Sequence, residues 1–214
     1  MKHVQFSFTA TPEKVEVSAI LLRTDKATHL LVLVHGASTN MSHATMLKIA
    51  EALAEQGIAT FRYNFPYSEN GRGRDSTQVC VGTIRSAVMA AREAAPDFTL
   101  LAGGHSFGGR MTSTAQSESP LDGVKGLVFF SFPLHLAGRP DTKRAEHLKQ
   151  IKIPMLFLSG THDALAEYVR TAFRVATSGV PGPVYIALPF DILTRQVQDP
   201  PRPAPPRPWP RQPG

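Results

Sequence analysis

A serine lies at the centre of the segment Gly104–Gly108 (GHSFG), between an apolar run and a segment that can form a helix. A serine on such a strand-to-helix turn has an exposed hydroxyl, and the flanking glycines remove side chains that would collide with the neighbouring backbone. The free N–H groups at the start of the following helix favour negative charge on a reacting oxygen. The spacing therefore predicts that Ser106 is a nucleophile for acyl transfer, and the alternative is a glycine-rich turn with an incidental serine.

Two other segments carry groups that this chemistry needs. Ala37 follows the apolar run His29–His35, so its N–H can join the N–H of Phe107 in an oxyanion hole. Asp163 follows the apolar run Ile153–Ser159 and lies after the serine in the chain, where the acid of a Ser-Asp-His triad is expected. The alternatives are a plain turn after the first run and a helix N-cap at Asp163.

Alternating apolar runs and helical patterns must position these residues. Strands are predicted at Val15–Leu22, His29–His35, Ile58–Tyr63, Phe98–Gly103, Val124–Ser131, Ile153–Ser159 and Pro183–Leu188. Helices are predicted at His43–Gln56 and Val79–Ala95, from Gly109 to about residue 117, and over 164–178, with a loop at Asn64–Thr77. This alternation predicts an α/β fold with a mostly parallel, doubly wound sheet whose two faces are both covered.

The composition fits one domain over residues 1–199 and a separate tail over 200–214. The hydrophobic content is 42% and the mean hydropathy is -0.12, and no apolar run approaches the roughly 18 residues that a membrane span needs. The first fifteen residues alternate as a strand does and lack the apolar core of a secretory signal. The single cysteine, Cys80, is expected to be a small buried residue on a helix, and together these features favour the cytoplasm.

The net charge of +6 does not indicate a nucleic-acid partner, because the positive residues are spread along the chain. Eight of the fifteen tail residues are proline, so the tail is expected to be disordered with polyproline II character, and a role as a proline-motif ligand is the alternative. The sequence contains no recognisable metal cluster, dinucleotide loop or nucleic-acid module, so no metal and no cofactor is expected. The expected partner is a small acyl substrate, with no nucleic acid and no membrane.

Residues 15–163 resemble the α/β-hydrolase superfamily, in particular its small dienelactone-hydrolase-like branch. The segments that carry the resemblance are LLVLVHGAS, FRYNFPY, LAGGHSFGGR, FFSFPLH and LSGTHD. The resemblance implies a serine hydrolase in which Ser106 is the nucleophile, Asp163 the orienting acid, and the amides of Ala37 and Phe107 the oxyanion donors.

The histidine that completes the family's triad is missing from its expected place. In the family it follows the acid, whereas all eight histidines of this chain precede Asp163. Without a base, a serine hydroxyl attacks poorly. His135, on the loop after Val124–Ser131, and His162, beside Asp163, are the candidates for a substitute base.

Residues 168–199 resemble a different family, the thiamine-diphosphate-dependent enzymes of the acetolactate-synthase type, at the end of their N-terminal domain. The signature is AFRxAxSGxPGPVYIxLPxD, and neither the catalytic glutamate nor the metal-binding motif of that family is recognisable. This predicts a fused or rearranged C-terminal part over 164–199. The sequence as a whole predicts an impaired serine hydrolase acting on an ester, thioester or related acyl bond, and the alternative is a non-catalytic binding scaffold of the same fold.

Overall fold

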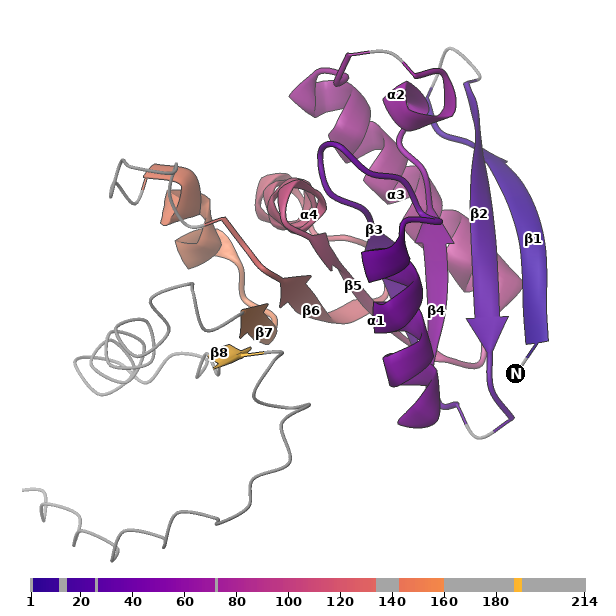
Figure 1. The fold of residues 1–214 in the computed structure, drawn as a ribbon. Helices are drawn as coiled ribbons and strands as arrows, with labels where there is room; N and C mark the ends of the chain where they lie inside the picture. The colour runs from indigo at the N-terminus through magenta and orange to yellow at the C-terminus, as the bar shows by residue number, and fades with distance from the viewer. Residues whose placement is uncertain are drawn as a thin grey trace, which may run out of the picture.

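A computed structural model describes residues 2–11, 15–25, 27–71, 73–133, 143–159 and 187–189. Its centre is an eight-stranded sheet in the order β1-β2-β4-β3-β5-β6-β7-β8 (Figure 1). The strands are β1 (Lys2–Thr9), β2 (Glu16–Arg23), β3 (His29–Val34), β4 (Ile58–Tyr63), β5 (Thr99–His105), β6 (Val124–Phe130), β7 (Met155–Ser159) and β8 (Ala187–Pro189). β1, β2 and β4 pair in antiparallel fashion, and all other neighbours are parallel. The predicted mostly parallel sheet is confirmed.

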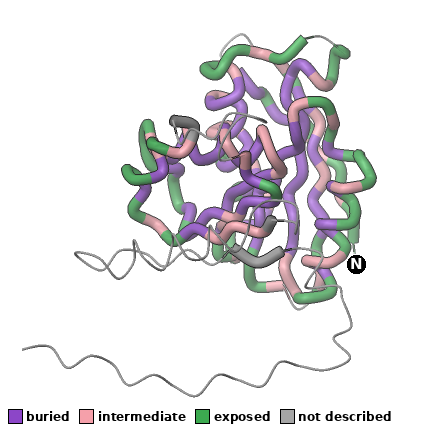
Figure 2. Tube along the Cα trace, turned by 60° about the vertical axis from the view of Figure 1, so that its left-hand side comes forward, coloured by how far each residue is buried: buried purple, intermediate pink, exposed green. Residues whose placement is uncertain are grey.

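Helices lie on both faces of this sheet, as the sequence predicts. α1 (Ala44–Glu55) packs over β3 and β4 on one face, where Met46 and Ile49 meet Leu31 and Leu33. The helices α3 (Thr77–Ala94) and α4 (Phe107–Glu118) cover the other face, which holds the larger apolar cluster. Figure 2 shows the buried residues running through the middle of the molecule. Cys80 is fully buried on α3, as predicted.

Besides the edge strand β1, which is not among the seven predicted strands, the structure differs from the sequence prediction in three places. A short helix, α2 (Pro66–Glu69), lies inside the predicted loop Asn64–Thr77, because Pro66 sits at the first helical position, where its fixed φ and missing N–H are tolerated. A 3-10 helix, η1 (Lys143–Gln150), lies in the segment predicted as a polar loop before β7. The strand β5 runs to His105 and α4 begins at Phe107, so the turn between them is a single residue.

No helix in the described part of the chain is long and apolar enough to cross a membrane. Among the same residues, no group of three or more acidic, histidine or cysteine side chains could hold a metal ion. The predicted disordered tail, residues 200–214, and most of the atypical part, 164–199, lie outside the described residues.

Candidate active site

Ser106 is the one residue between β5 and α4, and its backbone has φ 50° and ψ -113°. Positive φ is costly for a residue with a Cβ, so the surrounding structure must hold it in place. The Ser106 N–H donates to the carbonyl oxygen of Phe130 at 2.8 Å, and its own carbonyl accepts from the N–H of Arg110 at 3.2 Å. These bonds tie the turn to β6 on one side and to the first turn of α4 on the other.

Four glycines allow the backbone to pack closely around this turn. A Cβ added to Gly103 would lie 1.8 Å from the carbonyl oxygen of Val128, and one on Gly104 would lie 2.7 Å from the backbone of Gly108 and Gly109. Real Cβ atoms do not approach other atoms so closely. The glycines are therefore required for α4 to start directly above β5 and beside β6.

The two backbone N–H groups predicted as oxyanion donors belong to neighbouring segments. Phe107 is the first residue of α4, where the N–H groups have no partner within the helix. Ala37 follows β3, which is the direct neighbour of β5 with Val34 paired to Gly104. A Cβ on Gly108 would lie 2.4 Å from the carbonyl oxygen of His35, so the start of α4 is in contact with the chain that leads to Ala37.

His35, two residues before Ala37, has a fully buried imidazole. Its Nε2 accepts from the N–H of Phe65 at 3.2 Å, so the ring proton is on Nδ1, which donates to the carbonyl oxygen of Gly36 at 2.7 Å. Burial lowers the pKa of His35 from 6.5 to about 4, against the hydrogen bond with Gly36, which raises it. His35 is therefore neutral at neutral pH, and both of its nitrogens are engaged away from Ser106.

Three other described imidazoles, those of His105, His43 and His147, contact residues other than Ser106. His105 packs against Gly36, since a Cβ there would lie 3.0 Å from its Nδ1, and burial followed by the charge of His43 lowers its pKa. His43 caps α1 by accepting from the N–H of Thr45, and His147 lies 2.7 Å from the hydroxyl of Ser113. Within the residues that the structure describes, no imidazole forms a hydrogen bond with the Ser106 hydroxyl.

The sequence profile of the alpha/beta hydrolase domain family matches residues 27–178, which is more than two thirds of the chain. The chain belongs to the alpha/beta hydrolase domain family. Several solved structures share this hydrolase fold at low sequence identity. A dienelactone hydrolase from Anabaena variabilis is 16% identical with a TM-score of 0.64, and the alignment covers 89% of this chain and 88% of that one.

Two further solved structures share this fold at low sequence identity. An alpha-beta serine hydrolase homologue from Coxiella burnetii is 18% identical with a TM-score of 0.65, covering 89% of this chain and 88% of its own. An esterase from Pyrococcus furiosus is 15% identical with a TM-score of 0.65, covering 88% of this chain and 82% of its own. At this level of identity the likeness establishes the hydrolase fold. The resemblance of residues 168–199 to thiamine-diphosphate-dependent enzymes stays a prediction.

Three of the residues predicted for this hydrolase site, Asp163, His135 and His162, lie outside the described residues. The described strand β7 ends at Ser159, so Asp163 follows its carboxyl end by four residues. Parallel pairing aligns His105 with Phe130 and Phe130 with Leu158, which places the carboxyl ends of β5, β6 and β7 at one rim of the sheet.

Ser131 is a rim residue that the sequence did not single out. It follows β6 with φ 50°, is exposed, and donates its N–H to the carbonyl oxygen of Leu158 at 2.7 Å. It carries no glycine-rich signature like that of Ser106, so no sequence signal marks it.

The ring of Phe107, the residue after Ser106, is in contact with three other side chains. The guanidinium groups of Arg74 and Arg110 lie 5.3 and 5.6 Å from its centroid, and Phe65 packs against it edge-on at 6.1 Å. Arg74 belongs to the predicted loop Asn64–Thr77, and it stacks on an aromatic ring at the site.

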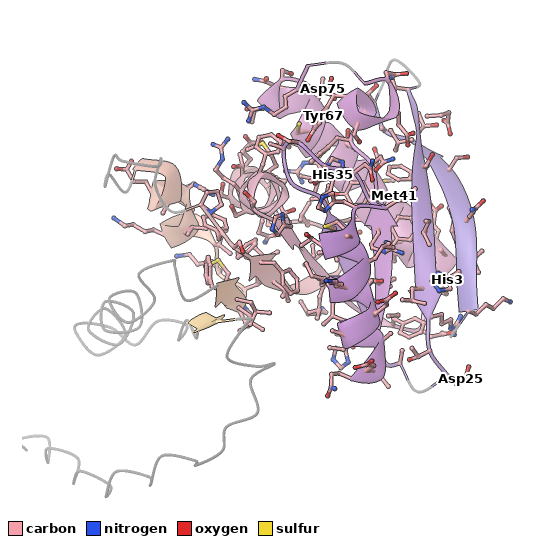
Figure 3. The ribbon with its side chains drawn as sticks, in the orientation of Figure 1. His3, Asp25, His35, Met41, Tyr67 and Asp75 are labelled. Atoms are coloured by element: carbon pink, nitrogen blue, oxygen red, sulfur yellow. The ribbon has the colours of Figure 1, made fainter. Side chains whose placement is uncertain are left out.

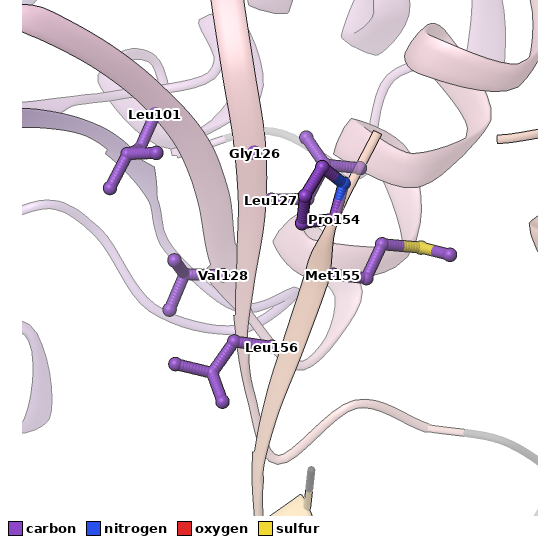
Figure 4. A pocket seen from close by; sticks show the side chains of 7 residues that line it. All are labelled: Leu101, Gly126, Leu127, Val128, Pro154, Met155 and Leu156. Carbon is purple, nitrogen blue, oxygen red and sulfur yellow. The ribbon is translucent and has the colours of Figure 1, made fainter. Parts of the chain in front are cut away.

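Two hollows lie along the α1 face of the sheet, beyond the part that α1 covers. One, of about 290 Å³, is floored by β5, β6 and β7 and includes the side chains of Leu101, Val128 and Leu156 (Figure 4). The other, of about 260 Å³, lies at the carboxyl end and is bounded by α1, His105, Phe130 and Ser131.

Proposed function

We propose that this chain is a serine hydrolase of acyl bonds with Ser106 as its nucleophile. The observation that carries the proposal is the backbone of Ser106, held at positive φ between a buried strand and the N-terminus of α4. Strained backbone of this kind persists only where the surroundings enforce it, and it is concentrated at functional sites. Relatives of the same fold named as a dienelactone hydrolase and an esterase support acyl-bond hydrolysis as the reaction class.

The chemistry proceeds in two steps. Ser106 Oγ bonds to the acyl carbon while its proton passes to a base, and the N–H groups of Ala37 and Phe107 bind the oxygen that becomes negative. The bond to the leaving group then breaks, and that group takes the proton. Water attacks the acyl-serine in the same way, which releases the acid and restores the hydroxyl. A small acyl compound is the proposed substrate, and the cytoplasm is the proposed location.

The proposed activity is low because the general base is not where the family places it. No histidine follows Asp163 in the sequence, and the described imidazoles of His35, His43 and His147 form hydrogen bonds with residues other than Ser106. His135 and His162 are the proposed substitutes, with Asp163 as the proposed acid. Loss of a triad member lowers the rate of catalysis by several orders of magnitude.

The second candidate is a binding scaffold with no catalysis, and the same shortage of a base favours it. Labelling with a fluorophosphonate probe separates the two candidates, because the probe bonds to an activated serine. The wild type is compared with Ser106→Ala and with Ser131→Ala, which removes a hydroxyl at the same rim from a residue with the same φ.

The hydrolase proposal expects covalent labelling of the wild type and of Ser131→Ala, but not of Ser106→Ala. The rate should be about three orders of magnitude below that of an enzyme with a complete triad. A folded wild-type protein that takes up no probe would refute the hydrolase and favour the scaffold. Labelling that persists in Ser106→Ala would assign the nucleophile elsewhere.

A further inference from the structure

The chain segment that follows β3, residues 36–43, is held at both of its ends by side chains from β4, α2 and the segment between them. Figure 3 labels His35 and Met41, which follow β3, and Tyr67 and Asp75, which lie on and after α2, and shows them on the same side of the molecule. Residues in a turn ordinarily bond within the turn or to water. Here three of the contacts come from residues more than twenty positions away in the sequence.

Three side-chain donors surround one carbonyl oxygen at the first end. The oxygen of Gly36 lies 2.7 Å from Nδ1 of His35, 3.3 Å from the hydroxyl of Tyr67 and 3.3 Å from the hydroxyl of Thr39. A carbonyl oxygen has two lone pairs, so its acceptor capacity is fully used. The direction of this carbonyl group is therefore fixed by the protein rather than by solvent.

The direction of that carbonyl sets the direction of the next N–H. In a trans peptide the C=O of one residue and the N–H of the following residue lie in one plane and point in opposite directions. The Gly36 carbonyl points toward His35 and Tyr67, so the N–H of Ala37 points away from them. Rotation of this peptide would break these three hydrogen bonds and a fourth, from the backbone N–H of Thr39 at 3.4 Å.

The donors are themselves held in place. The Tyr67 N–H donates to Oδ2 of Asp75 at 2.8 Å, and the Tyr67 ring stacks on Phe65 with centroids 5.7 Å apart. The His35 ring meets both of these rings edge-on, at 5.3 and 5.8 Å. The short helix α2 thus holds the tyrosine hydroxyl over the Gly36 carbonyl.

The second end of the segment is clamped at Met41. Its N–H donates to Oδ1 of Asn64 at 2.8 Å, and its carbonyl accepts from Nη1 of Arg62 at 2.8 Å. Asn64 in turn donates to Oε1 of Glu69 at 3.2 Å, and Arg62 is only 1% exposed. Both backbone groups of Met41 are therefore satisfied by side chains from the end of β4.

We infer that His35, Tyr67 and Thr39 are positioning residues that hold the Ala37 N–H toward the oxyanion through the Gly36 carbonyl. The inference rests on the proposed function, because Ala37 is an oxyanion donor only if Ser106 is the nucleophile. Tyr67 and Thr39 act without touching the reacting atoms. Their effect is on the rate of the covalent step and not on binding of the probe, because a fixed donor needs no reorganisation when charge develops.

The test uses Tyr67→Phe, Thr39→Val and the double variant. Each single variant leaves two side-chain donors for the two lone pairs, so its maximal rate of fluorophosphonate labelling should stay within about twofold of the wild type. The double variant leaves His35 as the one side-chain donor, beside the longer bond from the backbone N–H of Thr39 at 3.4 Å, and its maximal rate should fall about tenfold with unchanged probe affinity. Thr83→Val is the matched control, since it removes a buried hydroxyl that bonds within α3 at 2.8 Å.

A second readout keeps the inference separate from the proposed function. Hydrogen exchange at the Ala37 amide, measured by NMR, should be about tenfold faster in the double variant than in the wild type or in Thr83→Val, whether or not the protein reacts with the probe. Unchanged exchange at Ala37 in a folded double variant would overturn the positioning role. A labelling rate equal to that of Thr83→Val would overturn it as well, whereas a wild type that does not label would overturn only the proposed function.

Discussion

Acid should destabilise this fold through His35. The side chain is 0% exposed, and burial lowers its pKa to about 4, whereas a histidine in an unfolded chain titrates near 6.5. Protonation would put a second ring proton on Nε2, where the N–H of Phe65 already points. The charged form is therefore disfavoured both by burial and by the loss of an acceptor.

The folded and unfolded pKa values of His35 set the sign and the size of its effect on stability. Above pH 6.5 the histidine is neutral in both states, so its contribution to stability is fully present. As the pH falls from 6.5 toward 4, the unfolded chain binds a proton that the folded chain does not, so the free energy of unfolding decreases. The full loss at pH 4 is about 3 kcal/mol, a large part of the stability of an ordinary domain.

Urea unfolding at intervals between pH 7 and pH 4 measures this loss. Wild type, His35→Gln and His3→Gln are compared, the last being a control that removes an exposed histidine from the edge strand β1. His105 contributes in the same direction in all three proteins, so the difference between the wild type and His35→Gln isolates His35. If both lose the same free energy over this range, or if NMR titration of the His35 ring gives an ordinary pKa, the reasoning is wrong.

Two substitution tests and one alkylation reaction examine the packing of buried residues. Gly108→Ala places a Cβ 2.4 Å from the carbonyl oxygen of His35 and should lower the free energy of unfolding by more than about 2 kcal/mol. The control Gly82→Ala on α3 adds a Cβ that meets nothing within 4 Å, and it should raise the free energy of unfolding by up to about 1 kcal/mol. Equal effects of the two substitutions in thermal unfolding would contradict this expectation. Thr60→Val should stabilise the protein by about 1 kcal/mol, because its buried hydroxyl has no hydrogen-bond partner within the described structure, and a lower unfolding midpoint would count against it. Burial raises the pKa of Cys80 to about 12, so its alkylation by iodoacetamide at pH 8 should require unfolding, and rapid reaction of the folded protein would disprove the assignment.

The backbone of the candidate site was largely predictable from local sequence. The glycines around Ser106 predicted a tight strand-to-helix turn because only glycine tolerates the close backbone approach that the structure shows, whereas the single-residue length of the turn was not predicted. The apolar run before His35 predicted the buried strand that carries Ala37 to the same rim. These inferences succeeded because each depends on residues within a few positions of the feature.

The side-chain contacts that support the site were not predictable in the same way. Tyr67 and Gly36 are 31 positions apart, and no local pattern indicates that a tyrosine in a predicted loop donates to that carbonyl. The short helix α2 that places Tyr67 is below the length at which helical periodicity is visible. The roles predicted for Asp163, His135 and His162 stay predictions, since these residues lie outside the described part.

The partial cover of the sheet by α1 has a consequence for how the molecule opens. Leu31 and Leu33 of β3 are at most 1% exposed, whereas Leu101, Val128 and Leu156 on the same face of β5, β6 and β7 are only half-buried. Folding therefore removes less apolar area from contact with water at β6 and β7 than at β3. The free energy that opposes local unfolding of β6 and β7 is correspondingly smaller. Backbone amides of β6 and β7 should therefore exchange with deuterium before those of β3 and β4, and local unfolding should start on the far side of Ser106 from α1.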